Sequence, residues 1–361
     1  MIVLAHHTTP LRLGTWAVYV FFILSGYWIA RMWDEKYSRT RAPVITFLVS
    51  RWWRLAPVLF CCLAVVISAS WALNWPLRPI TLSWALRQVL VVGSTFGPRV
   101  VPPQWSIDVE MQFYLAAALL FPGLSVLCRP RGRGNAVILT VSLVAFVATL
   151  VHLTTGGSPD FPILWPAASF FLVGILIWKS NWDPPKQVAI LTTSSFIAVA
   201  VLIVILPESR SALLISGRDP VVPHFAQWPV LLQAIGSLMM VPFICRNVRA
   251  TSSPLDRLLG NWAYPLYLFH WLPREWYYRH VDWAKGSWYN VTLFAVNVIV
   301  ALFGSLVILQ LIDRPMDQIR SRWVRGRLLP GLPRKTIVPS RNEVADRNKD
   351  CGRAESAWTG L

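Results

Sequence analysis

The chain has 361 residues, of which 55% are hydrophobic and 14% charged, whereas about a quarter of the residues in an ordinary soluble domain are charged. This composition excludes a typical soluble enzyme. The formal net charge of +17 would indicate nucleic-acid binding in a soluble protein. Here the basic residues lie in short segments between long apolar runs, as in the cytoplasmic loops of a multi-spanning protein. We therefore expect membrane lipids, and no nucleic acid, among its partners.

The predicted elements begin with an incomplete helix. Met1–His7 is apolar, but seven residues would rise only about 10 Å against a hydrocarbon core of about 30 Å. We expect this segment to be the end of a helix whose beginning is missing. About nine later segments have a length and composition suited to spanning the bilayer. In chain order they cover Trp16–Met32, Leu55–Leu73, Ile107–Leu127, Ala136–Leu153, Phe161–Trp178, Val188–Leu206, Phe225–Cys245, Trp262–Tyr278 and Tyr289–Ile312.

The segment Trp84–Phe96 is short for a span, and the positions of the basic loops constrain it. Basic residues mark the loops at Arg51/Arg54 and at Arg129–Arg133 as cytoplasmic. An even number of crossings must separate two cytoplasmic loops, yet three apolar segments lie between them. We therefore expect Trp84–Phe96 to enter and leave on the outer side as a re-entrant segment beside a cavity. The predicted fold is an all-α, polytopic membrane helix bundle of about ten transmembrane helices with one re-entrant segment.

Residues 316–361 are basic, polar and too poor in apolar runs to span. We expect a membrane domain over residues 1–315 and a partly disordered cytoplasmic tail over residues 316–361. No pair among the five cysteines has metal-ligand spacing, so we expect no metal site.

His6 and His7 stand at the outer end of the first helix. They are explained most simply as interfacial residues at a helix end. A neutral imidazole is also the usual general base for taking a proton from a hydroxyl. Both interpretations stay open on this pair alone.

The run Trp105-Ser106-Ile107-Asp108-Val109-Glu110 enters a predicted span. Carboxylates near a helix N-terminus can simply complement the helix dipole, which explains Asp108 well. Glu110 lies past the first turn and faces the apolar layer, where a carboxylate needs a partner. The predicted orientation places it on the same outer side as His6 and His7.

Two further groups lie elsewhere in the chain. Arg51 and Arg54 can be ordinary cytoplasmic charges, or they can bind the phosphates of an anionic ligand beside their aromatic neighbours. Tyr267 and His270 lie inside another predicted span, where an ionisable residue is a candidate for function.

Several ordered motifs resemble the acyltransferase-3 family of integral membrane O-acyltransferases. The likeness covers most of the chain up to about Pro315, and it rests on the order and spacing of the motifs together. They are Val3-Leu4-Ala5-His6-His7, Phe21-Phe22-Ile23-Leu24-Ser25-Gly26-Tyr27, Arg51…Arg54-Leu55-Ala56-Pro57, Trp105-Ser106-Ile107-Asp108-Val109-Glu110 with Phe113-Tyr114, Tyr264-Pro265-Leu266-Tyr267-Leu268-Phe269-His270, and Asp313-Arg314-Pro315.

The resemblance implies transfer of an acyl group, usually acetyl, from cytoplasmic acyl-coenzyme A to a hydroxyl of a surface glycan, a lipid-linked precursor or a similar acceptor. It implies a multi-pass protein of the bacterial inner membrane with a cytoplasmic C-terminus, and no tightly bound cofactor. The family's histidine maps to His6, with His7 one position away as a fallback, and its glutamate to Glu110. The donor-site residues map to Arg51 and Arg54. Substrate contacts are then expected from Trp105, Ser106, Asp108, Tyr114, Tyr267 and His270.

The family also carries a basic residue about three helical turns before its histidine, which this chain starts too late to contain. Two other classes of function remain possible on the sequence. Intramembrane His and Glu can form a path in a transporter or sensor, although no repeated halves are visible. A glycan-binding accessory subunit is a third possibility. Direct transfer and an acyl-histidine intermediate are equally compatible with the sequence.

Overall fold

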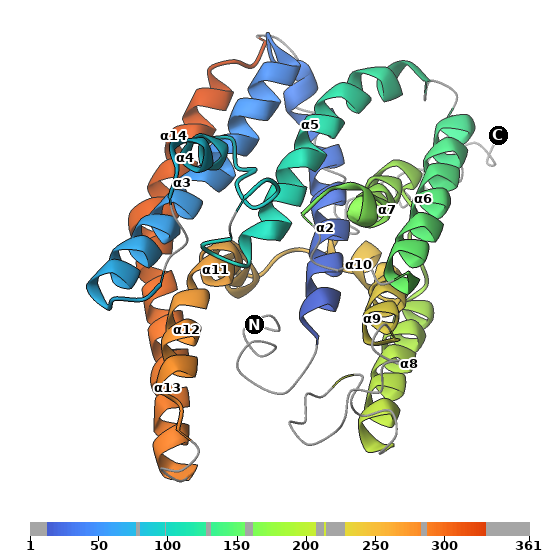
Figure 1. The fold of residues 1–361 in the computed structure, drawn as a ribbon. Helices are drawn as coiled ribbons and strands as arrows, with labels where there is room; N and C mark the ends of the chain where they lie inside the picture. Colours follow the sequence, from blue (N-terminus) through green and yellow to red (C-terminus); the bar gives the residue numbers. More distant parts are fainter. Residues whose placement is uncertain are drawn as a thin grey trace, which may run out of the picture.

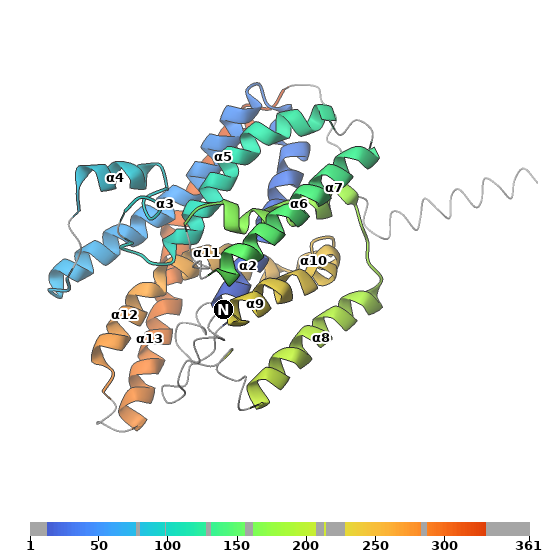
Figure 2. The ribbon, with the colours of Figure 1, turned by 45° about the vertical axis from the view of Figure 1, so that its right-hand side comes forward.

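The computed structural model describes residues 13–76, 80–97, 99–127, 131–155, 162–206, 213, 228–282 and 287–329. Within these ranges the chain is helical and forms no sheet, apart from an isolated bridge between Thr40 and Leu328. The prediction of an all-α protein is therefore confirmed. The helix α2 lies centrally, between a group formed by α3, α5 and α11 to α14 and a group formed by α6 to α10 (Figures 1 and 2).

The helices are, in chain order, α2 (Gly14–Glu35), η1 (Tyr37–Arg39), α3 (Pro43–Ala72), α4 (Leu82–Val89), α5 (Gln104–Leu127), α6 (Arg131–Thr154), η2 (Trp165–Ala167), α7 (Ala168–Ser180), α8 (Lys186–Ile205), α9 (Trp228–Met239), α10 (Val241–Asn247), α11 (Pro254–Phe269), α12 (Trp271–His280), α13 (Ser287–Ile308), the π-helical turn η6 (Leu309–Asp313) and α14 (Arg314–Arg325).

Four helical stretches in the described ranges are long and apolar enough to cross a membrane. They are Pro43–Ala72, Gly134–Thr154, Lys186–Ile205 and Trp288–Arg325. The pair Val230–Met239 and Val241–Asn247, bent by 43°, passes the same test as one broken span. A polytopic membrane protein is thus supported, while the expected total of about ten helices stays a prediction.

Two further helices have the length of a span but a more polar composition. α2 has 22 residues and α5 has 24. Each buries polar side chains such as Ser25 and Glu110 instead of exposing them. Burial of polar groups on facing helices is the usual sign that they surround a site in the bundle interior.

Glycines bring α2 and α7 into close contact. A Cβ added to Gly26 would lie 2.0 Å from the carbonyl oxygen of Phe171, and one added to Gly174 would lie 2.0 Å from that of Ile23. Beside this crossing, the rings of Tyr19 and Phe170 stack with their centroids 4.1 Å apart. Small residues permit such close backbone approach in membrane bundles. This contact fixes α2 at the centre of the structure.

Two predicted spans differ from the observed helices. The segment expected over Trp262–Tyr278 is divided into α11 and α12 at His270. The segment expected to end at Ile312 continues instead through η6 into α14. The expected domain boundary at residue 315 therefore falls inside a continuous helical stretch, in which Arg320 and Val324 are buried.

The predicted re-entrant segment forms a shorter helix than expected. α4 ends at Val89, and the chain from residue 90 to 97 is not helical. α4 lies on the outside of the bundle beside α3 (Figure 2). The entry of Trp84–Phe96 into the bilayer as a re-entrant segment stays a prediction.

Candidate active site

A cavity of about 470 Å³ lies between α2, α3, α5 and α11. This volume lies within the usual range of small-molecule sites. Most of its wall is apolar, with contributions such as Val18, Leu24 and Ile107. The polar side chains that line it are Ser25, Arg51, Arg54, Ser106, Glu110, Tyr114, Tyr264, Tyr267 and His270. Residues from four distant parts of the chain thus meet in one space.

Glu110 is buried in the wall of this cavity, with 4% of its surface exposed. Its Oε1 accepts hydrogen bonds from Ser25 Oγ at 2.8 Å and from the hydroxyl of Tyr114. Glu110 and Tyr114 are four residues apart on α5, so they lie on one face of the helix. Oε2 has no hydrogen-bond partner among the described residues. A buried carboxylate oxygen without a partner can accept a hydrogen bond from a further donor.

Arg51 lies in α3 and not in the loop expected from the sequence, and it is 7% exposed. Its Nη2 donates to the hydroxyl of Tyr37 at 2.7 Å. The guanidinium carbon lies 6.0 Å from the ring centroid of Tyr114, which is itself bonded to Glu110. Tyr37 and Tyr114 therefore hold the cation beside the buried carboxylate.

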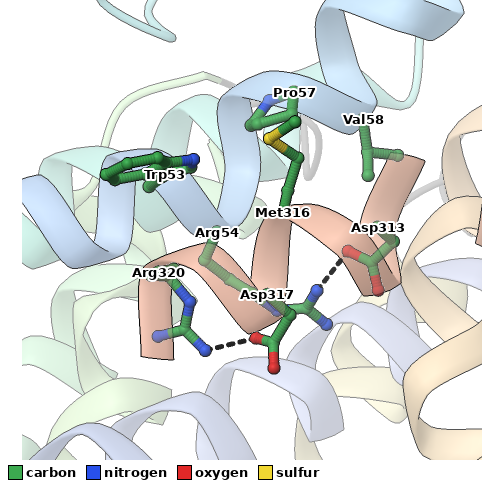
Figure 3. A pocket seen from close by; sticks show the side chains of 8 residues that line it. All are labelled: Trp53, Arg54, Pro57, Val58, Asp313, Met316, Asp317 and Arg320. Atoms are coloured by element: carbon green, nitrogen blue, oxygen red, sulfur yellow. Dashed lines mark hydrogen bonds and ion pairs between the residues drawn. The ribbon is translucent and has the colours of Figure 1, made fainter. Parts of the chain in front are cut away.

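Arg54 forms an ion pair with Asp313 at the other end of the chain. Nη1 lies 2.5 Å from Oδ1 of Asp313, and the guanidinium carbon is 5.6 Å from the ring centroid of Tyr264. Figure 3 shows Arg54 reaching from α3 to Asp313, next to a second pair formed by Asp317 and Arg320. Arg54 lines both this small cleft and the central cavity.

A hydroxyl pair lies on the α5 and α11 side of the cavity. Ser106 Oγ and the hydroxyl of Tyr267 are 2.7 Å apart. Nearby, Nδ1 of the buried His270 is 3.1 Å from the carbonyl oxygen of Leu266. Because a carbonyl only accepts, Nδ1 carries the proton, and in the neutral ring Nε2 is then the acceptor nitrogen. The cavity therefore offers hydroxyl groups and one imidazole to a ligand.

Asp108 and Trp105 do not line the cavity. Oδ2 of Asp108 accepts from the backbone nitrogens of Ser94 and Thr95 at 2.7 and 2.8 Å. Trp105 lies edge-on to Phe22, with the ring centroids 6.3 Å apart. Asp108 thus anchors the loop that follows α4, and Trp105 packs against α2. The structure does not bring these two expected substrate contacts to the cavity.

Comparison with known protein families decides the class of the protein. Residues 1–312 match the family model described as an acyltransferase domain. The chain belongs to the acyltransferase-3 family. Neither a curated protein nor a solved structure matches it.

Membership in this family makes the protein a membrane acyltransferase that transfers groups other than amino-acyl groups. The expectation of an enzyme is confirmed, and the transporter, sensor and accessory-subunit alternatives are set aside. The family match ends at residue 312, next to Asp313, which pairs with Arg54 of the cavity wall.

Two expected catalytic residues of the acyltransferase, His6 and His7, lie outside the described residues. The same holds for the expectation that the first helix is incomplete. The first turns of α2, which follow these residues in the chain, lie at the cavity, because Ala17 and Val18 contribute to its wall.

The partners of Arg51 and Arg54 could not be predicted from the segments in which these arginines lie. For Arg54 a signal existed, since Asp313 opens one of the family motifs and is an isolated carboxylate at the end of an apolar segment. For Arg51 there was no comparable signal, because its partner Tyr37 lies in a short polar segment with no motif. Among the described residues, no three His, Cys, Asp or Glu side chains gather as a metal site would require.

Proposed function

We propose that the protein is an O-acyltransferase that moves an acyl group, most simply acetyl, from cytoplasmic acyl-coenzyme A to a hydroxyl of a surface glycan, a glycolipid precursor or a similar acceptor. One observation supports it most: the central cavity collects two arginines, a buried glutamate, a histidine and several hydroxyl groups. Phosphate recognition and proton transfer need these residue types.

The donor would be held by Arg51 and Arg54. A guanidinium suits the phosphates of coenzyme A because it presents several donors in a planar fork. Tyr37 and Tyr114 position Arg51, and Asp313 positions Arg54. Pre-positioned cations lose little freedom when an anion binds.

The transfer would use His6 as the general base, with His7 as the fallback and Glu110 balancing or orienting the imidazole. The acceptor oxygen forms a bond to the thioester carbonyl carbon, and the carbon–sulfur bond breaks. The proton taken by the imidazole passes to the coenzyme A thiolate. In the alternative route an imidazole nitrogen first bonds to the acyl carbon while the carbon–sulfur bond breaks, and the thiolate leaves with the ring proton. The acceptor oxygen then bonds to the acyl carbon, the acyl–nitrogen bond breaks, and the acceptor proton returns to the imidazole.

The acceptor would meet the remaining polar residues of the cavity. Ser106 and Tyr267 form a hydroxyl pair, Tyr114 reaches Glu110, and His270 presents an imidazole to the same space. A sugar offers donors and acceptors that complement such groups.

The expected setting is the cytoplasmic membrane of a bacterium, with the C-terminus in the cytoplasm. Basic residues in the loops and in the last residues of the chain favour this orientation. In this orientation acyl-coenzyme A enters from the cytoplasm, where it is made.

The test is an assay of the purified full chain with acetyl-coenzyme A, measuring free thiol and the mass of candidate acceptors. We expect thiol release that depends on an acceptor, and the loss of an acyl group from surface glycans or lipids when the gene is deleted. An initial-rate study then separates the two routes, because only the acyl-histidine route gives ping-pong kinetics. Unchanged glycan and lipid masses after deletion would contradict the proposed acceptor class.

A further inference from the structure

A second cavity, of about 330 Å³, lies where the end of α3 meets α12 and α13. It shares no lining residue with the central cavity. Ala69 of α3, Leu272 of α12 and Val296 of α13 are typical of its apolar wall. The two cavities lie on either side of the α11–α12 break at His270. The central cavity is lined by α11 residues up to His270, whereas Leu272 is the first residue of α12 that lines the second cavity.

Asn297 is the polar exception in this second cavity. It is 1% exposed, and neither its amide nitrogen nor its amide oxygen has a hydrogen-bond partner among the described residues. Asn290, on the same helix, exchanges hydrogen bonds with the backbone of Asp282 at 3.0 and 3.2 Å. Leaving a buried amide without partners is costly. The Asn297 amide is therefore placed to bind a polar group of a molecule that occupies the cavity.

Two tryptophans in the wall indicate the depth of the cavity in the membrane. Trp75 follows the end of α3, and Trp276 lies in α12. Tryptophan is enriched at the level of the lipid headgroups. Arg279 lies over the ring of Trp75 at 4.9 Å, and the ring of His280 stacks on Trp276 at 4.6 Å. Arg279 also pairs with Glu275 one turn earlier on α12, with Nη2 2.7 Å from Oε1. Its guanidinium still stands at the side of the cavity where headgroup phosphates would lie.

Apolar residues that line the cavity reach the protein surface. Leu73 is 50% exposed and Val300 is 45% exposed, and both line the cavity. In a bilayer such apolar surfaces favour lipid over water, so a lipid is the molecule best suited to enter the cavity.

We propose that this cavity binds one glycerophospholipid. An acyl chain lies between α3, α12 and α13, an ester carbonyl accepts a hydrogen bond from Nδ2 of Asn297, and the phosphate lies near Arg279. Oδ1 of Asn297 accepts from a headgroup hydroxyl or an interfacial water. The site stands apart from the proposed transfer chemistry, because no residue of the central cavity takes part in it.

The first experiment compares two matched substitutions on α3. Ala69→Phe fills the cavity, whereas Ala72→Phe places the same side chain on an exposed position that does not line it. The full chain and both variants are purified in detergent, supplied with dioleoyl phosphatidylglycerol and examined by native mass spectrometry. We expect one tightly retained phospholipid on the wild type and on Ala72→Phe, and its loss from Ala69→Phe.

A second measurement covers the case in which Ala69→Phe folds poorly. Added dioleoyl phosphatidylglycerol should raise the unfolding temperature of the wild type, because a ligand that binds only the folded state stabilises it. Asn297→Leu removes the hydrogen bonds and should weaken this lipid dependence by about tenfold in lipid concentration.

Three results would overturn the proposal. The first is equal lipid retention by Ala69→Phe and Ala72→Phe. The second is an Asn297→Leu variant that is more stable than the wild type with an unchanged lipid response, as expected for a simple unsatisfied amide. The third is retention of a lipid-linked glycan in place of a phospholipid, which would assign the cavity to an acceptor.

Discussion

Arg54 and Asp313 are 259 residues apart in the sequence and form an ion pair 2.5 Å long. The pair joins α3 to the π-helical turn η6, and it lies between the small cleft of Figure 3 and the central cavity. One contact therefore ties a proposed donor-binding residue to the last spanning segment. Each partner should accordingly affect stability.

Asp313→Leu should lower the free energy of unfolding by about 1–3 kcal/mol, because it leaves the largely buried Arg54 cation without its carboxylate. Arg54→Leu should do the same, and the double variant should be less destabilised than the sum of the two single variants. Thermal unfolding in detergent measures all three. Simple additivity of the two single effects would show that the pair does not contribute as a unit.

Gly26→Ala and Gly174→Ala should each destabilise the protein by about 1–3 kcal/mol, because the new methyl groups would overlap backbone atoms across the α2–α7 contact. Gly123→Ala is the matched control, since a Cβ there meets nothing within 4 Å. It should leave stability unchanged or raise it by up to about 1 kcal/mol. Unfolding temperatures in one detergent provide the comparison, and a tolerated Gly26→Ala would mean that the two helices can separate.

His6→Ala should lower turnover by about 10²–10⁴-fold while the protein still inserts into the membrane, because the general base is lost. Glu110→Gln should have a similar effect, and the double variant should be little worse than either single one if the two residues act together. Steady-state kinetics in nanodiscs measures these effects. Should His6→Ala and His7→Ala both keep full turnover, the histidine mechanism is wrong.

Arg51→Gln should mainly raise the KM for acyl-coenzyme A, by roughly ten- to a hundredfold, because a charge-assisted phosphate contact is lost. Tyr37→Phe should raise it by only a few-fold, since it removes one hydrogen bond that holds the guanidinium. Arg257→Gln, an exposed arginine of α11 that does not line the cavity, is the control. An unchanged KM in Arg51→Gln would leave this arginine with a structural role alone.

The loop Glu208–Pro223 should face outward and Cys351 should face the cytoplasm, because the basic loops set the orientation. A membrane-impermeant thiol reagent added to intact cells should label Ser211→Cys and spare Cys351. Labelling of Cys351 from outside would reverse the proposed topology and with it the side from which the donor enters.

Hydropathy predicted where most helices lie, because an apolar run in a membrane protein has few other possible structures. It failed at α3, which begins at Pro43 and not at Leu55. The residues in between include Arg51, whose charge makes the segment look like a loop. Its burial depends on Tyr37 and on Tyr114 of another helix, and the composition of one segment carries no information about such partners.

Which residues share the central cavity could be predicted from the sequence more completely than the contacts between them. Ser106, Glu110, Tyr114, Tyr267 and His270 all line the central cavity, as a shared site requires. Asp108 lies two residues from Glu110 and on the same motif, yet it binds backbone nitrogens of the loop after α4. Two neighbours on a helix point in different directions, and which of them faces the cavity is decided by tertiary packing.

The π-helical turn η6 accommodates one extra residue between α13 and α14. A residue in an α-helix advances the side chain by about 100°, and a π turn holds one residue more than an α turn. A residue deleted within Leu309–Ile312 would therefore restore regular α winding in this turn and leave the faces of α13 and α14 where they are. A residue deleted from the first turn of α14 would instead rotate Arg320 and Val324 away from α3 by about that angle. Their buried contacts, including the 3.0 Å bond from Arg320 to Ser50 of α3, would then be lost. We therefore expect a single-residue deletion to be tolerated better within this turn than within the helix that follows it.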